Sequence, residues 1–336
     1  MKNRILFYSS VKSKSLFNTQ RFYRIDIEIL QNMGYDIILS NRIIDALWFW
    51  KYDIVFSYFY RYSLFVSLIA RTFGKNVYFT GGIDALDEEN TGKYAYRMQK
   101  VLFFLCYILS TKCIIVSKTD MEHVEDIVGK EAKKLAYSEH TIDTNNFNER
   151  LTKEKHCNFC TIGWMGSKDN VLRKGMDKAL ILFAYLKKFE YFSASKFYII
   201  GKKGEGTILL EKIIKDLKIE DSVIITGEVS ESQKVDMLKD NKYYFQLSTY
   251  EGFGLAALEA LIAKCIIIHS GKGGLANPIY KEHIIVNINS SLESQVGSIY
   301  NRMVNINMNK IKELSNSCLC YYDNKRRLED FKRILS

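Results

Sequence analysis

Two glutamates eight positions apart form the pattern in this sequence that is best suited to chemistry. Glu251 and Glu259 lie in the segment Ser248-Thr-Tyr-Glu-Gly-Phe-Gly-Leu-Ala-Ala-Leu-Glu. If a helix begins near Gly254, its first N–H groups carry partial positive charge and suit phosphate or hydroxyl oxygens. Gly252 would let a ligand approach the backbone closely. Glu251 would then lie at the mouth of a cleft and Glu259 about one and a half turns into the helix, which suits an extended substrate with hydroxyls at both ends.

Two further loops carry residues of the same kind. Arg173 and Lys174 precede Gly175 in a predicted turn between strand and helix, and Ser270-Gly-Lys-Gly-Gly follows another predicted strand. Arg can neutralise a diphosphate through a bidentate fork and Lys as a point charge. An isolated pair of glutamates would favour a simpler interpretation, a helix-start residue and a solvated helix face. The three loops together favour a ligand site, because open α/β sheets bind ligands at the carboxyl ends of their strands.

The elements that would position these residues are predicted by apolar runs that alternate with helical patterns. Predicted strands cover residues 4–9, 36–39, 52–58, 76–79, 112–117, 159–164, 196–200, 222–226, 243–247 and 265–269. Predicted helices cover residues 20–33, 176–189, 207–217, 232–239 and 254–263, and Ser117 is expected to cap a helix near Asp120. This alternation predicts an α/β protein with parallel, doubly wound sheets.

Composition and length limit the class of protein. The chain has 336 residues, 47% of them hydrophobic and 26% charged, which excludes disorder and fibrous repeats and suits two domains. The polar stretch 143–155 is the expected connection between them. Seven cysteines, an odd number, and the absence of an apolar leader predict a reduced, cytoplasmic protein. The longest uncharged apolar run, Val101–Leu109, is far shorter than the roughly 20 residues that a spanning helix needs.

The formal net charge of +10 suggests nucleic acid, an anionic membrane surface or phosphorylated ligands as partners. Nucleic acid is not expected, because no basic stripe with interleaved aromatic residues matches a known module. Residues 94–109 combine basic, aromatic and apolar residues, and a core helix is favoured over a membrane-interface helix there. The preferred membrane candidate is a basic and aromatic set, with solvated charges and packed tyrosines as its alternative: Lys12, Lys14, Arg21, Arg24, Tyr58, Phe59, Tyr60, Arg61, Tyr62 and Arg71.

The chain resembles the retaining glycosyltransferases of family 4, which have the GT-B fold. Glu251–Glu259 matches the E-x7-E signature of that family, and the match extends through EGFGLAALEA. Residues 199–204 and 223–230 resemble its loops around the nucleotide, residues 162–177 its VGR...KG segment, and residues 140–147 its NGID...F linker. The resemblance implies two Rossmann-like domains that face each other across a cleft. The acceptor domain would be residues 1–150 with a C-terminal helix at about 319–336, and the nucleotide-sugar domain residues 151–318.

The resemblance also implies roles for individual residues. Glu251 would hold hydroxyls of the donor sugar and Glu259 the ribose, while Lys174 and a nearby Arg would bind the diphosphate. The remaining implied donor-binding residues surround these or flank the base: Gly201, Gly227, Glu228, Gly252, Phe253, Gly254 and Leu255.

The sequence departs from the family pattern at three places. Trp164 stands where the family has the diphosphate arginine, so Arg173 or Lys168 would replace it. The N-terminal Gly-Gly loop is replaced by Ser9–Ser15, in which Ser10 and Lys12 are acceptor candidates. Thr80, Gly81 and Gly82 occupy the place of the HG-x-D segment and are also acceptor candidates. Gly81 stands where the histidine would be, which leaves Asp84 and backbone groups as catalytic help near the reacting sugar.

We therefore expect a retaining glycosyltransferase that uses a nucleotide-diphosphate sugar and no cofactor. No Asp-x-Asp pair is present, so Arg, Lys and helix N-termini are expected to neutralise the diphosphate without a metal. A zinc site is not expected, because Cys157, Cys160, Cys318 and Cys320 have unsuitable spacing.

The expected acceptor is a lipid-linked or surface-polysaccharide glycan of O-antigen or capsule type. The expected location is the cytoplasm, peripheral on the inner face of a bacterial plasma membrane. Alternative functions are a non-catalytic partner that binds a glycan or nucleotide sugar, and a nucleotide-sugar epimerase or phosphorylase of the same fold.

Overall fold

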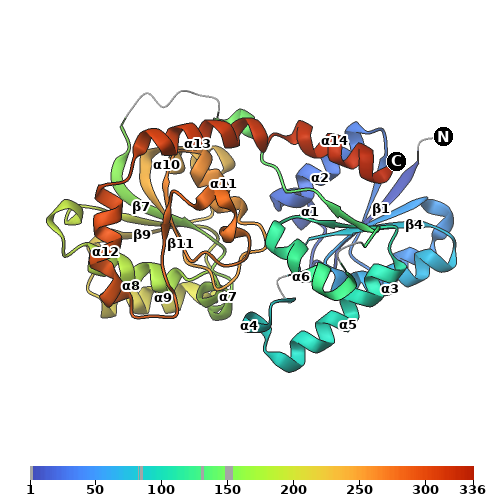
Figure 1. The fold of residues 1–336 in the computed structure, drawn as a ribbon, viewed down its shortest axis with the longest axis horizontal. Helices are drawn as coiled ribbons and strands as arrows, with labels where there is room; N and C mark the ends of the chain where they lie inside the picture. Colours follow the sequence, from blue (N-terminus) through green and yellow to red (C-terminus); the bar gives the residue numbers. More distant parts are fainter. Residues whose placement is uncertain (1–2, 82, 84–85, 130–131, 148–153) are drawn as a thin grey trace. The chain divides into compact units, whose positions relative to one another are not determined.

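The computed structural model describes residues 3–81, 83, 86–129, 132–147 and 154–336. The chain divides into unit 1, Met1–Asp143 with Tyr322–Ser336, and unit 2, Thr144–Tyr321. Each unit contains one six-stranded sheet whose paired strands are all parallel, with helices on both faces (Figure 1). The predicted α/β architecture with two doubly wound sheets is confirmed.

The sheet of unit 1 has the strand order β2-β1-β3-β4-β5-β6. Its strands are β1 (Arg4–Tyr8), β2 (Asp36–Ser40), β3 (Ile54–Tyr58), β4 (Asn76–Thr80), β5 (Lys112–Ile115) and β6 (Leu135–Tyr137). β1 and β3 are almost wholly buried because helices cover both faces of the sheet, which is why their sequences are continuous apolar runs. The direction of winding reverses between β1 and β3.

Two sets of helices cover the sheet of unit 1. On one face, α2 (Arg21–Asn32) packs with the C-terminal helix α14 (Asn324–Leu335) in one apolar cluster. α3 (Tyr60–Thr72), α5 (Lys93–Leu109) and α6 (Lys118–Val128) contribute to a second cluster on the other face. As predicted, Ser117 caps α6 by accepting a hydrogen bond from the Asp120 N–H. α1 (Leu16–Thr19) and α4 (Glu88–Thr91) are single turns.

An internal ion pair fastens α14 to α2. The Arg327 guanidinium donates to both Asp26 carboxylate oxygens, from Nε at 2.6 Å and from Nη2 at 2.8 Å, and both side chains are fully buried. Arg327 Nη1 donates to the Ser138 and Glu139 carbonyl oxygens. Arg327 therefore faces inward on the C-terminal helix, where the carboxylate and two carbonyls replace its hydration.

The sheet of unit 2 has the strand order β12-β11-β10-β7-β8-β9. Its strands are β7 (His156–Ile162), β8 (Phe197–Ile200), β9 (Val223–Gly227), β10 (Asn241–Gln246), β11 (Ile266–His269) and β12 (Ile284–Ile285). Winding reverses between β7 and β10, so the loops that follow these two strands lie side by side at the carboxyl edge of the sheet. The sequence did not predict β6 or β12, whose two or three residues are too short to give a periodic pattern.

The helices of unit 2 also form two layers (Figure 1). α8 (Met176–Leu186), α9 (Glu205–Asp216) and α12 (Leu292–Val304) share one apolar cluster with the strands. α11 (Leu255–Ile262) contacts α10 (Glu231–Asp240) and α13 (Met308–Tyr321). The short α7 (Lys168–Arg173) follows β7. Across both units, none of the helices in the described ranges is both long and apolar enough to cross a bilayer.

Candidate functional site

The predicted site residues of unit 2 meet at the carboxyl edge of its sheet. Lys174 follows α7, and Glu251 lies in the loop between β10 and α11. Lys174 Nζ donates to Glu251 Oε1 at 2.8 Å and to Oε2 at 2.9 Å. The two side chains are only 17% and 14% exposed. The sequence predicted both residues for a donor site but not the ion pair that joins them.

Two neutral side chains on and after β10 also bind the Glu251 carboxylate, and a third supports them. Glu251 Oε2 accepts from Ser248 Oγ at 3.0 Å and from Gln246 Nε2 at 3.2 Å. Gln246 Oε1 accepts from the Tyr244 hydroxyl at 2.9 Å, and that hydroxyl accepts from the Ile162 N–H at 3.3 Å. A continuous hydrogen-bonded chain therefore runs from the end of β7 to the carboxylate. Sequence reasoning missed this chain, although the polar alternation Tyr244, Gln246, Ser248 in an apolar strand is a signal for it.

The surroundings of Glu251 keep it ionised. Burial raises the pKa of this carboxyl, but the Lys174 ammonium that contacts it outweighs burial, aided by Arg173 and by the hydrogen bond from Ser248. The net result is a pKa below the usual value for glutamate. At neutral pH the group is a fixed carboxylate that can accept hydrogen bonds from ligand hydroxyls, and Lys174 is a cation beside it.

Close backbone contacts set the shape of the loops around this pair. A Cβ on Gly175, whose φ is +64°, would lie 2.0 Å from the Leu247 carbonyl oxygen. A Cβ on Gly273, whose φ is +61°, would lie 2.3 Å from the Glu251 carbonyl oxygen, which also accepts from the Gly274 N–H at 2.6 Å. These glycines let the three loops touch backbone to backbone, so the predicted loops do converge on Glu251.

Glu259 lies on α11 and is 3% exposed, so it does not occupy a solvated helix face. Lys234 of α10 reaches it, with Nζ 3.0 Å from Oε2 and 3.2 Å from Oε1. Lys234 also donates to Glu231 Oε2 at 2.9 Å. Sequence reasoning missed Lys234, because nothing in the sequence around it indicates that α10 packs beside α11.

The remaining residues predicted near the sugar and the diphosphate occupy the same loops. Gly254 is the N-cap of α11 with φ +87°, Leu255 is its first residue, and space beside Gly252 is open. Phe253 is partly exposed between these glycines. Arg173 ends α7 and donates to Asn170 Oδ1 at 3.0 Å. Lys168, the first residue of α7, is exposed.

The residues predicted around the base follow the next two strands. Gly201 follows β8, and a Cβ there would lie 2.1 Å from the Gly163 carbonyl oxygen. Gly227 ends β9 with φ +80°. Glu228 is 72% exposed and lies 4.0 Å from Lys202 Nζ. Gly201 touches the loop after β7, and none of the three residues makes a described contact with Glu251.

The predicted acceptor residues belong to unit 1. Ser10 and the exposed Lys12 follow β1, while Thr80 ends β4 and Gly81 follows it with φ +76°. Thr80 is fully buried. β1 and β4 both flank β3, so these residues lie at one edge of the sheet. Gly82 and Asp84, the other two residues predicted for unit 1, lie outside the described residues.

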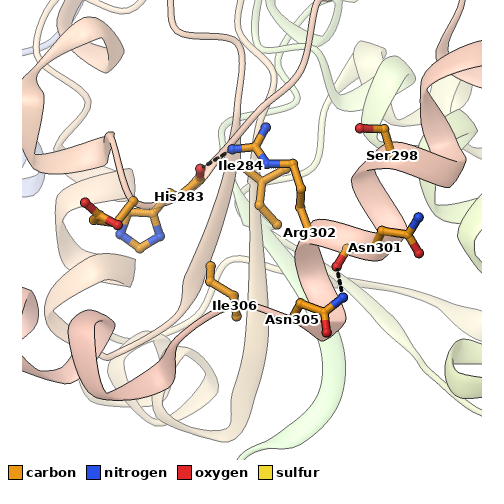
Figure 2. Close-up of a pocket in the computed structure, with 8 residues that line it drawn as sticks. His283, Ile284, Ser298, Asn301, Arg302, Asn305 and Ile306 are labelled. Carbon is orange, nitrogen blue, oxygen red and sulfur yellow. Dashed lines mark hydrogen bonds between the residues drawn. The ribbon is translucent and has the colours of Figure 1, made fainter.

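Unit 2 also has a cavity of about 630 Å³ away from this site. Arg302 and Asn301 of α12 line it together with His283, and Arg302 donates to the His283 carbonyl oxygen at 2.9 Å (Figure 2). His283 Nδ1 accepts from the Ile267 N–H near the start of β11, so the cavity lies near the opposite end of this strand from the Glu251 loop. Among the described residues, no three His, Cys, Asp or Glu side chains group as metal ligands.

Comparisons with known proteins match one segment of unit 2 to a protein family. Residues 168–294, which contain Lys174, Glu251 and Glu259, match the model of the family described as glycosyl transferases group 1. No curated protein sequence matches the chain.

Several solved structures are similar in fold. Anabaena HepE in complex with UDP and glucose has a TM-score of 0.74 at 11% identity, over 99% of each chain. Sucrose-phosphate synthase from Thermosynechococcus elongatus has a TM-score of 0.74 at 10% identity, over 99% of this chain and 98% of that one. A TarM variant from S. aureus in complex with fondaparinux, alpha-GlcNAc-glycerol and UDP has a TM-score of 0.64 at 16% identity, over 84% of this chain and 55% of that one. The fold is that of the GT-B proteins, and with the matched segment it identifies the enzyme as a glycosyltransferase.

Proposed function

We propose that this enzyme transfers a sugar from a UDP-sugar to a glycan acceptor, with retention of anomeric configuration and without a metal ion. The observation that carries the donor assignment is the clamp of Lys174 on Glu251 at the carboxyl edge of the unit 2 sheet. UDP is the proposed nucleotide because the structures of HepE and TarM that are similar in fold contain UDP.

The proposed roles follow from charge and position. Glu251 is an ionised acceptor of hydrogen bonds, suited to the hydroxyls of a sugar. Lys174 is a partly buried cation directly beside it, suited to the diphosphate that leaves. The N-terminus of α11, with Gly254 as its N-cap, adds N–H groups for the same oxygens. Glu259 is proposed to hold the ribose. Its carboxylate would then accept hydrogen bonds from the ligand as well as from Lys234.

Metal independence is proposed because the chain has its own cations at this edge. Lys174 and Arg173 adjoin the Glu251 loop, since the Thr249 N–H donates to the Arg173 carbonyl at 2.9 Å. Preorganised cations and helix N–H groups can stabilise charge as it develops on a leaving group. We expect full activity after treatment with EDTA. Loss of activity on that treatment, with recovery when Mg²⁺ or Mn²⁺ is added, would contradict the proposal.

Retention is proposed to proceed by attack on the same face that the diphosphate leaves. In this proposal the leaving phosphate accepts the proton of the acceptor hydroxyl, and Asp84 with backbone groups assists near the sugar. The anomeric configuration of the new glycosidic bond, determined by NMR and compared with that of the donor, tests this directly. An inverted product would reject it.

The proposed acceptor is a lipid-linked or surface-polysaccharide glycan, which places the enzyme in the cytoplasm at the inner face of a membrane. Unit 1 is the proposed acceptor-binding unit, with Ser10, Lys12, Thr80 and Gly81 at its sheet edge. The basic balance of residues 1–80, eleven Lys and Arg against five Asp and Glu, supports an anionic or phosphorylated acceptor.

The central experiment measures release of nucleoside diphosphate from a panel of UDP-, GDP- and ADP-sugars with a glycan acceptor. Glu251→Ala should reduce turnover at least 100-fold, because it removes the ligand-facing carboxylate and leaves Lys174 without a partner. Glu211→Ala, at an exposed position of α9, is the matched control and should keep full turnover.

The same experiment separates the alternatives. Nucleotide binding without release of nucleoside diphosphate in any reaction would favour a non-catalytic partner. Conversion of the sugar nucleotide to its epimer without an acceptor would favour an epimerase. Equal turnover of Glu251→Ala and the wild type would remove Glu251 from the catalytic assignment.

A further inference from the structure

Helix α5 of unit 1 turns apolar side chains toward solvent. Six large apolar residues between 41% and 86% exposed follow each other at helical spacing: Tyr94, Met98, Val101, Phe104, Leu105 and Ile108. The opposite side of the helix, with Phe103 and Cys106, is buried in the unit 1 core. The expectation that residues 94–109 form a core helix is therefore correct for one side of α5 only.

Helix α3 packs beside α5 (Figure 1). Its outward residues Tyr62, Phe65 and Leu68 are 54%, 57% and 49% exposed. Both helices cover the same face of the unit 1 sheet, and we call their combined solvent-facing side the α3/α5 face. Contiguous exposed apolar side chains of this extent are typical of a surface that another molecule covers.

The α3/α5 face is strongly basic as well as apolar. Neither helix contains an aspartate or glutamate. Together they carry five basic residues: Arg61, Arg71, Lys93, Arg97 and Lys100. Helices that lie in the interface of an anionic bilayer typically combine aromatic and aliphatic side chains with cations. The composition of α3 and α5 is of this kind.

We infer that the α3/α5 face docks on an anionic membrane surface. A second copy of the chain is a poorer occupant, because a two-fold contact would bring five cations of each copy together, and neither α3 nor α5 has a carboxylate to pair with them. Anionic lipid headgroups supply the missing negative charge, and the acyl boundary covers the apolar side chains. The inference rests on the proposed function in one respect, the location at a membrane.

This surface shares residues of α3 with the membrane candidate drawn from the sequence. Tyr58 and Tyr60 of that candidate are fully buried, so the prediction is wrong for them, and the packed-tyrosine alternative is correct. Tyr62, Arg61 and Arg71 remain, because they lie on α3 and are exposed. The periodicity of α5 alone did not reveal which side of the helix faces the sheet.

Sedimentation of the full chain with vesicles tests the inference. We expect at low salt at least tenfold more protein bound to vesicles of phosphatidylcholine and phosphatidylglycerol than to phosphatidylcholine alone. Val101→Asp, at a position 60% exposed on α5, should lower anionic binding about tenfold or more. Arg97→Ala should lower it about fivefold, since each basic residue near an anionic surface contributes a factor of that size. Ile208→Asp, 66% exposed on α9 of unit 2, is the matched control and should bind like the wild type.

Three outcomes would overturn the inference. The first is equal recovery of the wild type in the supernatant with both lipids. The second is unchanged binding of Val101→Asp, with its melting temperature confirming that it folds. The third is a dimer seen by analytical ultracentrifugation that Val101→Asp dissociates, which would make the face a contact between copies. Thermal shift with UDP on the same samples reports the donor site separately, so loss of vesicle binding with intact UDP binding leaves the proposed function standing.

Discussion

Units 1 and 2 are built from the same layers but place their charged pairs differently. In unit 2, Lys174 and Lys234 hold Glu251 and Glu259 at or near the carboxyl edge of the sheet, where ligands bind. In unit 1, the fully buried pair of Arg327 and Asp26 lies between two helices on a face of the sheet. The comparison suggests that the pairs of unit 2 are available to exchange partners with a ligand, whereas the pair of unit 1 is structural.

The largest effect should come from breaking the structural pair. Arg327→Ala leaves the Asp26 carboxylate buried without its cation, and such a loss costs about 3–5 kcal/mol of unfolding free energy. Chemical denaturation measures this change. Arg333→Ala, on the same helix but 74% exposed, is the matched control and should change stability by less than about 1 kcal/mol. Equal effects of the two variants would mean that the buried pair does not hold α14.

A pH effect of about 3 kcal/mol is expected from His269 in unit 2. Burial lowers the pKa of His269 to about 4, whereas the unfolded chain takes up its proton near pH 6.5. Its contribution to stability is therefore complete above pH 6.5 and is lost as the pH falls toward 4. His269→Gln should flatten the decline in unfolding free energy over this range. His156→Gln, at an exposed histidine, should leave the decline as it is.

Glycine substitutions should distinguish the close-packed site loops from ordinary helix surface. Gly175→Ala should destabilise the chain by about 2–3 kcal/mol, because its φ of +64° and the Leu247 carbonyl leave no room for a Cβ. Gly297→Ala on α12 has open space and helical backbone, so it should stabilise by about 0.5–1 kcal/mol. Thermal unfolding measures both, and the same sign for the two variants would contradict the proposed packing.

The smallest effect should come from the hydrogen-bonded chain behind Glu251. Gln246→Leu removes a donor to Glu251 and the acceptor of the Tyr244 hydroxyl. We expect kcat/KM for transfer to fall about tenfold, corresponding to ~1.4 kcal/mol, because the carboxylate is held less precisely. Gln295→Leu is the control and should leave kcat/KM unchanged, because Gln295 lies on α12 and its hydrogen bonds are to Asn287 and Ser291. Unchanged kcat/KM in Gln246→Leu would show that Lys174 and Ser248 are sufficient to position Glu251.

Much of the fold was predictable because buried parallel strands have continuous apolar sequences. β4, β8 and β10, for example, follow from runs rich in aromatic and β-branched residues, and their ends differ from prediction by at most two residues. Strand order was not predictable in the same way. The adjacency of β7 and β10 brings together residues about 80 positions apart, and no local pattern encodes it.

The site was predictable where a residue type had a distinctive local setting. Glu251 and Lys174 stand beside glycines at strand-to-helix turns, and the structure brings these two side chains together. Glu259 was predicted from its spacing of eight positions from Glu251. Lys234 and Gln246 were not predictable, because one appears as an ordinary lysine on a charged helix and the other as an interruption of an apolar strand. Arg327 is separated from Asp26 by 301 positions, so its burial depends on a tertiary contact alone.

The return of α14 to unit 1 has a consequence for the order in which the protein can be made. Unit 2 is one unbroken stretch, Thr144–Tyr321, whereas unit 1 needs Tyr322–Ser336 as well as Met1–Asp143. During synthesis, unit 2 can fold as soon as its own residues have left the ribosome. Asp26 is synthesised early, but its ion-pair partner Arg327 is synthesised only after unit 2. Unit 1 begins first and is completed last, so a nascent chain arrested before α14 should hold a finished unit 2 beside an open unit 1.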